Sequence, residues 1–183
     1  MRNLLRMTAS TFHLAPMTRE LRVVTWLLFA MPAIMLYGAL SAPFLIGAAL
    51  FATTAFVALV YAGVWFGFRP SRFELDAHAL RIVWPLRSRV IERADIESAR
   101  IVTSTEFRNE YGYGMRIGAG GLWGGFGLLK TSRETFSMWI SRTDRFVIVQ
   151  LRGARPLLLT PTLPERFVDM LTSPAHSSSS AHP

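Results

Sequence analysis

The sequence predicts a membrane protein in which a two-helix transmembrane hairpin precedes a mostly-β domain. Two apolar runs without a charged residue, 23–40 and 44–68, are separated only by three residues. Beyond Phe68, apolar residues alternate with polar ones in short runs, which is typical of half-buried strands. From Leu163 to Leu171 the apolar spacing changes to that of an amphipathic helix.

Each apolar run is close to the length that a helix needs to cross a bilayer, about 20 residues. A buried helical hairpin of a soluble protein is disfavoured, because runs without a charge leave no face for water. A cleaved signal peptide is the other alternative, since residues 39–41, Ala-Leu-Ser, resemble a cleavage site. Against it stand the long leader before the first run and the second apolar run that follows at once.

The arginines predict the orientation of the hairpin. Basic residues collect on the cytoplasmic side of a membrane, and here they flank the hairpin while its connecting turn has none: Arg2, Arg6, Arg19, Arg22, Arg69 and Arg72. Both chain ends are therefore expected in the cytoplasm. The expected divisions are an N-terminal segment 1–22, the hairpin 23–68, a domain 69–172 and a disordered tail 173–183.

Seven short strands are expected in the domain, forming an antiparallel barrel or sandwich. They cover residues 73–75, 80–84, 89–91, 96–103, 136–140, 146–151 and 156–160. A capping-box spacing, Thr162 to Glu165, predicts the start of the C-terminal helix. In the segment 11–16, Phe12 and Leu14 alternate with Thr11 and His13, so we expect this segment to contact the domain or to lie at the membrane interface.

Several segments resemble the bacterial membrane proteins that carry a pleckstrin-homology (PH)-like domain after a helical hairpin. They are residues 72–75 and 80–82, the element from Val90-Ile91 to Asp95-Ile96, the stretch 116–127, and the ending from 159–161 to 164–167. The resemblance implies a PH-like fold, one C-terminal helix and a place at the bacterial cytoplasmic (inner) membrane. It carries no general enzymatic activity.

The glycine-rich stretch from Tyr111 to Gly127 is the most unusual part of the domain. One interpretation is a bulged, sharply turned connection between two strands, with aromatic side chains filling the core beside it. The other is a flexible loop that presents Leu122, Trp123 and Phe126 to the bilayer or to a partner. The candidate contact residues are Arg116, Gly120, Gly121, Leu122, Trp123, Gly124, Phe126 and Gly127.

Basic residues near the start of the domain form a second candidate surface. Arginine side chains close to a membrane exit suit anionic lipid, although the alternative is a set of solvent-facing strand residues. The candidates are Arg69, Arg72, Arg81, Arg87, Arg89 and Arg93. The first predicted β-turn, 76–79, contains no Lys or Arg, which disfavours headgroup recognition at that turn.

The sequence indicates no catalytic, cofactor or metal site. It has no cysteine, and its four histidines, His13, His78, His176 and His182, are scattered. Acidic pairs such as Glu106 and Glu110 are expected to be surface ion-pair partners. The net charge of +8 forms no clustered stripe of the kind that binds nucleic acid.

These features favour a non-catalytic binding or assembly module on the membrane, without a cofactor. Its expected partners are the lipid bilayer and another protein or a second copy of the chain, as in a subunit of a membrane complex. A lipid-sensing regulator is the alternative from another class, and a small integral-membrane enzyme is the third.

Overall fold

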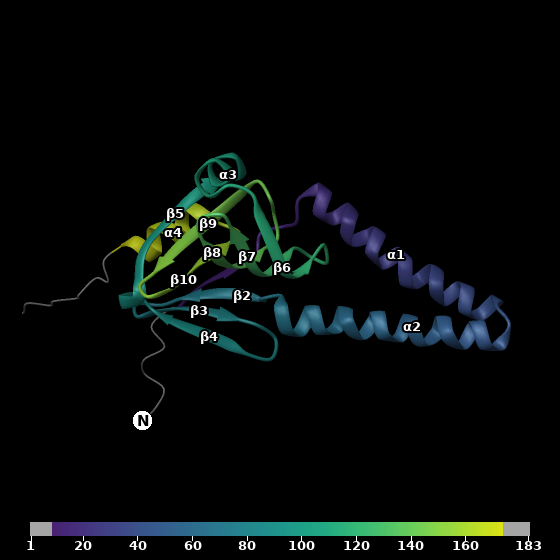
Figure 1. Ribbon diagram of the computed structural model, residues 1–183. Helices are drawn as coiled ribbons and strands as arrows, with labels where there is room; N and C mark the ends of the chain where they lie inside the picture. The colour runs from purple at the N-terminus through teal and green to yellow at the C-terminus, as the bar shows by residue number, and fades with distance from the viewer. Residues whose placement is uncertain (1–8, 174–183) are drawn as a thin grey trace, which may run out of the picture.

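The computed structural model describes residues 9–173 as a helical arm attached to a two-sheet β domain (Figure 1). The arm consists of α1 (Arg19–Ser41) and α2 (Phe44–Gly63), and α2 continues as a π-helical segment (Val64–Phe68). Both helices are long and apolar enough to cross a membrane. Residues 1–8, with Arg2 and Arg6, and most of the expected tail, 174–183, lie outside the described part.

The helical arm projects from the β domain instead of being buried in it (Figure 1). Trp26 and Ile34 are each 70% exposed and Leu45 is 80% exposed. The apolar arm is therefore no core hairpin of a soluble domain, which was one alternative at the sequence level. At its far end the helices approach closely at Gly47, where a Cβ atom would lie 2.7 Å from the carbonyl oxygen of Ala39.

The first sheet contains a strand from each side of the helical arm. Its order is β1-β2-β3-β4, all antiparallel: β1 (Ser10–His13), β2 (Arg72–Leu75), β3 (Ala79–Val83) and β4 (Ser88–Glu92). Because β1 precedes α1 and β2 follows α2, the whole arm is an insertion between two paired strands. The expectation that residues 11–16 contact the domain is confirmed. Cleavage after Ser41 would remove a strand from this sheet, which argues against a signal peptide.

The second sheet has the order β5-β9-β10-β8-β7-β6. Its strands are β5 (Ile96–Thr103), β6 (Gly114–Gly120), β7 (Gly125–Thr131), β8 (Thr135–Ile140), β9 (Arg145–Leu151) and β10 (Ala154–Leu159). A short 3-10 segment (Arg93–Asp95) joins the sheets, α3 (Ser104–Tyr111) follows β5, and α4 (Pro164–Thr172) follows β10.

The seven predicted strands correspond to β2, β3, β4, β5, β8, β9 and β10. The described residues contain three further strands, and the expectation of purely antiparallel pairing is wrong. Strand β10 runs parallel to β8, with Leu158 opposite Met138, because it lies between β8 and β9 and reverses direction only relative to β9. The helix α3 was also missed at the sequence level.

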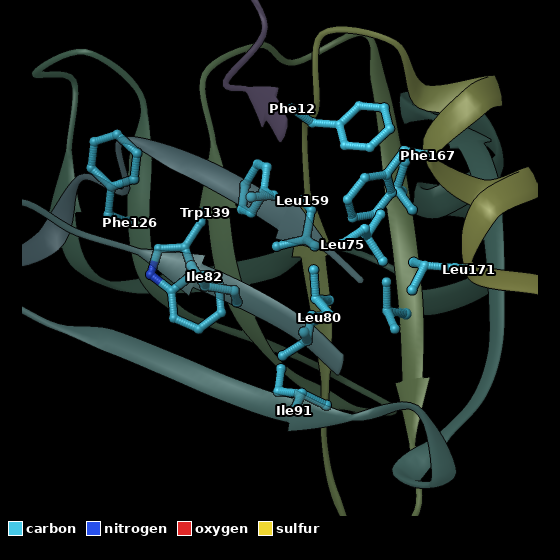
Figure 2. Packing of buried hydrophobic residues seen from close by; sticks show 14 of the residues in the cluster. Phe12, Leu75, Leu80, Ile82, Ile91, Phe126, Trp139, Leu159, Phe167 and Leu171 are labelled. Atoms are coloured by element: carbon cyan, nitrogen blue, oxygen red, sulfur yellow. The ribbon is translucent and has the colours of Figure 1, made fainter. Parts of the chain in front are cut away.

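The main hydrophobic core lies between the two sheets and under α4 (Figure 2). Strand β1 contributes Phe12, which is 4% exposed and packs edge-to-face on Phe167 of α4 at a centroid distance of 5.2 Å. Leu75 and Leu80 of the first sheet and Leu159 of the second complete its centre. A second cluster lies under α3, where Phe107 and Tyr111 of that helix contact Phe136.

The predicted capping box at Thr162 is not formed. The helix α4 begins at Pro164, and the Thr162 hydroxyl donates to the carbonyl oxygen of His13 at 2.9 Å. Glu165 instead forms an ion pair with Arg145. Thr162 therefore holds the segment after β1 against the domain. Pro164 supplies the fixed φ of the first turn of α4.

We predict that Phe12→Ala destabilises the protein by about 3–5 kcal/mol, the usual effect of removing a buried phenylalanine side chain. Denaturant unfolding of the full chain in mild detergent measures the change. Thr11→Ala is the matched control, because Thr11 is an exposed residue of the same strand and its replacement should cost less than about 1 kcal/mol. Equal effects of the two substitutions would show that β1 does not belong to the core.

Candidate functional site

The glycine-rich stretch forms a β-hairpin, β6–β7, and not an irregular loop. Residues 114–120 pair with residues 125–131, and the N–H of Gly121 donates to the carbonyl oxygen of Gly124 at 3.0 Å to close the turn. Gly118 and Gly127 lie opposite each other with φ values of 134° and 128°, and a Cβ atom on either would lie 2.4 Å from a carbonyl oxygen of the partner strand. Glycine is therefore required for this close backbone approach.

The tip of the hairpin is attached to the helical arm through Thr25 of α1. The Thr25 Oγ1 lies 2.9 Å from the carbonyl oxygen of Gly121 and accepts from the N–H of Trp123 at 3.2 Å. Its single proton can be donated either to Gly121 or to the carbonyl oxygen of Leu21, 2.8 Å away. Because Thr25 is only 6% exposed, these polar groups satisfy one another away from water.

Trp123 occupies the space between the two helices of the arm. Its ring contacts Phe29 of α1 at a centroid distance of 5.6 Å and Trp65, beyond α2, at 4.8 Å, both edge-to-face. In Figure 1 the tip of β6–β7 points into the opening where α1 and α2 diverge toward the domain. Tyr61 of α2 joins the cluster through its ring, which contacts Phe29 edge-to-face at a centroid distance of 5.2 Å. Its hydroxyl donates to the carbonyl oxygen of Leu28 at 2.6 Å.

The backbone of Trp123 is strained. Its φ of 58° is the one left-handed value among the non-glycine residues that the structure describes. This conformation costs roughly 1–2 kcal/mol for a residue with a side chain, and such strain persists only where surrounding contacts determine it. The aromatic contacts with Phe29 and Trp65, and the hydrogen bond to Thr25, supply that constraint.

The structure divides the candidate contact residues into three groups. Leu122 and Phe126 are 7% and 0% exposed and belong to the main core, so they are not presented to a partner. Trp123 contacts the helical arm, with the glycines around it forming the turn. Arg116 lies on β6 with its side chain beside Gly120 and Gly125.

Strand β6 is an edge strand with exposed apolar side chains. It pairs with β7 on one side and is the last strand of its sheet. Tyr113, which directly precedes it, is 82% exposed, and Met115 and Ile117 are 64% and 49% exposed. Residues at every second position share a face of a strand, so these three form one apolar row beside an unpaired backbone edge.

The basic candidates are not brought together in one patch. Arg72 and Arg81 both lie near Glu74, at 2.6 and 3.8 Å. Arg93 donates to the carbonyl oxygen of Met170 at the end of α4. Arg89 is exposed on β4, the edge strand of the first sheet.

Two of the basic candidates lie beside the exit of the helical arm instead. The Arg69 guanidinium stacks over Trp65 at 4.4 Å, and burial lowers the pKa of Arg69. Arg87 stacks over Trp84 and donates to the carbonyl oxygen of Gly67 at 2.8 Å. These two arginines therefore fix the junction between the arm and the first sheet.

The carboxyl groups with clearly shifted pKa values all have structural partners. The side-chain hydrogen bond from Arg100 lowers the pKa of Glu110, and the backbone N–H of Thr103 lowers the pKa of Glu106, which forms the capping box of α3. Glu110 is thus an ion-pair partner as expected, whereas Glu106 is a helix cap.

The structure describes two of the four histidines. His13 and His78 are exposed, and His176 and His182 lie outside the described residues. Among residues 9–173 no three side chains of His, Asp or Glu lie together as a metal site requires.

Comparison of the chain with models of known protein families, with curated proteins and with solved structures finds no match.

We predict that Thr25→Val, which keeps the shape of the side chain but removes the hydroxyl, destabilises the full chain by about 1–3 kcal/mol. The N–H of Trp123 would remain without its acceptor in a buried position, and such a group costs that amount. Thr25→Ser is the control, because it retains the oxygen. Denaturant unfolding in detergent, followed by tryptophan fluorescence, measures both. A loss as large for Ser as for Val would contradict the hydrogen bond as the link between tip and arm.

Proposed function

We propose that the protein is a membrane-anchored, non-catalytic binding and assembly module, held at the cytoplasmic face of a bacterial inner membrane. The helical arm crosses the bilayer. The β domain has a PH-like fold, and it presents one edge to a protein partner or to a second copy of the chain. The observation that carries the proposal is the exposed apolar edge of β6, on a hairpin whose tip is seated on the arm.

The exposure of the arm supports the membrane anchor. Apolar side chains on all sides of α1 and α2 require a cover, and a helix satisfies its own backbone hydrogen bonds in lipid. Trp26 of α1 and Trp65, just beyond α2, lie at the domain ends of the helices, where interfacial aromatic residues are common. The described arginines that flank the arm favour the cytoplasm for the β domain.

The pairing of β1 with β2 supports a single side for both ends of the arm. Four residue pairs, from Ser10 with Leu75 to His13 with Arg72, join the chain before α1 to the chain after α2. A membrane-crossing hairpin closed in this way has its domain on one face only. The seating of Trp123 between the helices then limits rotation of the domain about that closure.

The edge of β6 supports binding to protein. An unpaired strand edge is a template for a further strand, and natural proteins commonly protect such edges with charges or cover them. Here the apolar row of Tyr113, Met115 and Ile117 lies beside the free edge, as in β-augmentation, where main-chain hydrogen bonds and alternate side chains bind a partner strand.

Two further features accord with this proposal. The lowered pKa values of Glu106 and Glu110 suit structural ion pairs and caps, whereas a general acid at neutral pH needs a raised pKa. Two sheets with a C-terminal helix agree with a PH-like domain in outline. Strand β1 and the β6–β7 hairpin would be additions to the seven strands expected, and the parallel β8–β10 pair would be a departure from their antiparallel pairing.

We predict that the helical arm determines membrane association. A chain in which residues 18–69 are replaced by a flexible Gly/Ser linker of about ten residues should be found in the soluble fraction, whereas the full chain should stay in the membrane pellet after alkaline carbonate extraction. A cytoplasmic reporter fused after Pro183 should be active and alkaline phosphatase fused there inactive. The reverse pattern would overturn the orientation, and a soluble full chain would overturn the anchor.

We predict that a photo-crosslinking amino acid at Ile117 captures a protein partner or a second copy in intact membranes. Placement at Val90, a half-exposed residue on the edge strand β4 of the other sheet, is the control and should give no specific product. Ile117→Lys should abolish the complex with less than about 1 kcal/mol loss of stability, as expected for an exposed site. Equal products from both positions, or none from Ile117, would contradict binding at β6.

A further inference from the structure

A crevice of about 440 Å³ lies on the helical arm beside the tip of the β6–β7 hairpin. Such a volume falls within the range of small-molecule binding sites, about 300–1,000 Å³. Its walls come from the start of α1 and from the hairpin tip: Met17, Arg22, Thr25, Trp26, Phe29 and Trp123. One charged side chain, that of Arg22, is present among them.

The lining residues of α1 follow one another along the helix axis. Arg22, Trp26 and Phe29 are spaced at i, i+4 and i+7, so they share one face of the helix. At 1.5 Å per residue, Arg22 and Phe29 are separated by about 10 Å along the axis. The crevice is therefore cationic at the end nearest the β domain, where Arg22 lies in the first turn of α1. It is aromatic farther along the arm, at Trp26 and Phe29.

Arg22 has an exposed side chain and makes no ion pair with any residue in the described range. Guanidinium groups bind phosphate through paired, charge-assisted hydrogen bonds. Trp26 is 70% exposed and Phe29 is 38% exposed, so apolar surface continues from the guanidinium into the crevice.

We propose that this crevice binds one anionic phospholipid of the cytoplasmic leaflet. Its phosphate contacts Arg22, and the first part of an acyl chain lies along Trp26 and Phe29 and against Trp123. The proposal rests on the insertion of the arm proposed above, which places Arg22 at headgroup level. Because Trp123 is both a wall of the crevice and the residue seated between the helices, the bound lipid stabilises the seated tip.

Native mass spectrometry of the full chain in mild detergent tests the site, with phosphatidylglycerol and phosphatidylcholine of identical acyl chains as probes. The wild type should bind phosphatidylglycerol more tightly. Arg22→Gln should weaken phosphatidylglycerol binding about tenfold or more, the effect of losing a charge-assisted hydrogen bond. It should weaken phosphatidylcholine binding less, because the choline cation already opposes the guanidinium beside the same phosphate. Arg19→Gln is the matched control, since Arg19 precedes Arg22 by one turn and does not line the crevice. Trp26→Ala should weaken both lipids equally.

Three outcomes would overturn the proposal: equal binding of the two lipids, equal effects of Arg22→Gln and Arg19→Gln, or binding of glycerol phosphate without acyl chains as tight as that of the lipid. Carbonate extraction of the same variants separates this result from the anchor. A wild type that stays in the membrane but shows no Arg22-dependent preference refutes the lipid site alone, and a wild type that leaves the membrane refutes the anchor and the site with it.

Discussion

The arrangement of the whole molecule depends on the pairing of β1 with β2. The two strands are neighbours in one sheet although the entire helical arm lies between them in the sequence. Closing so long a loop costs conformational entropy, and the burial of Phe12 against Phe167 offsets part of that cost. Antiparallel pairing returns both ends of the arm to the same end of the sheet. The helical arm is consequently an insertion in the β domain, and its two helices leave the domain on the same side.

The hairpin β6–β7 makes a second connection and gives the arm its orientation. Thr25 holds two backbone groups of the hairpin tip, while Trp123 accepts a strained φ and contacts aromatic side chains from both sides of the arm. The opposite end of the same hairpin carries the exposed apolar row that includes Met115 and Ile117. A partner bound at this edge and a lipid bound beside Trp123 would therefore both contact the same hairpin, which links the proposed assembly and lipid sites physically.

Local patterns in the sequence predicted most strands, because half-buried sheets impose a period of two on the side chains. They could not predict the parallel β8–β10 pair, which depends on where β10 is inserted and not on its own residues. The β6–β7 strands were missed because glycine disfavours strands in general, whereas Gly118 and Gly127 permit a close approach seen only in the folded sheet. In contrast, α3 could have been found, since Thr103 and Glu106 form a capping box readable in the sequence. Trp123 was among the candidate contact residues, but its contacts with α1 and the burial of Phe126 required the tertiary structure.

The most direct test of the central pairing is a disulfide between β1 and β2 in native membranes. The chain has no cysteine, so paired substitutions can be read without background. Thr11 and Glu74 are opposite each other, and neighbouring strands place paired Cα atoms within the range of about 4.4–6.8 Å that a disulfide needs. Thr11→Cys with Glu74→Cys should oxidise nearly completely, as measured by protection from a maleimide-polyethylene glycol label. Thr11→Cys with Val90→Cys, which joins β1 to a strand that is not its neighbour, should remain labelled. Full labelling of the first pair, or equal protection of both, would contradict the closure of the helical arm by β1 and β2.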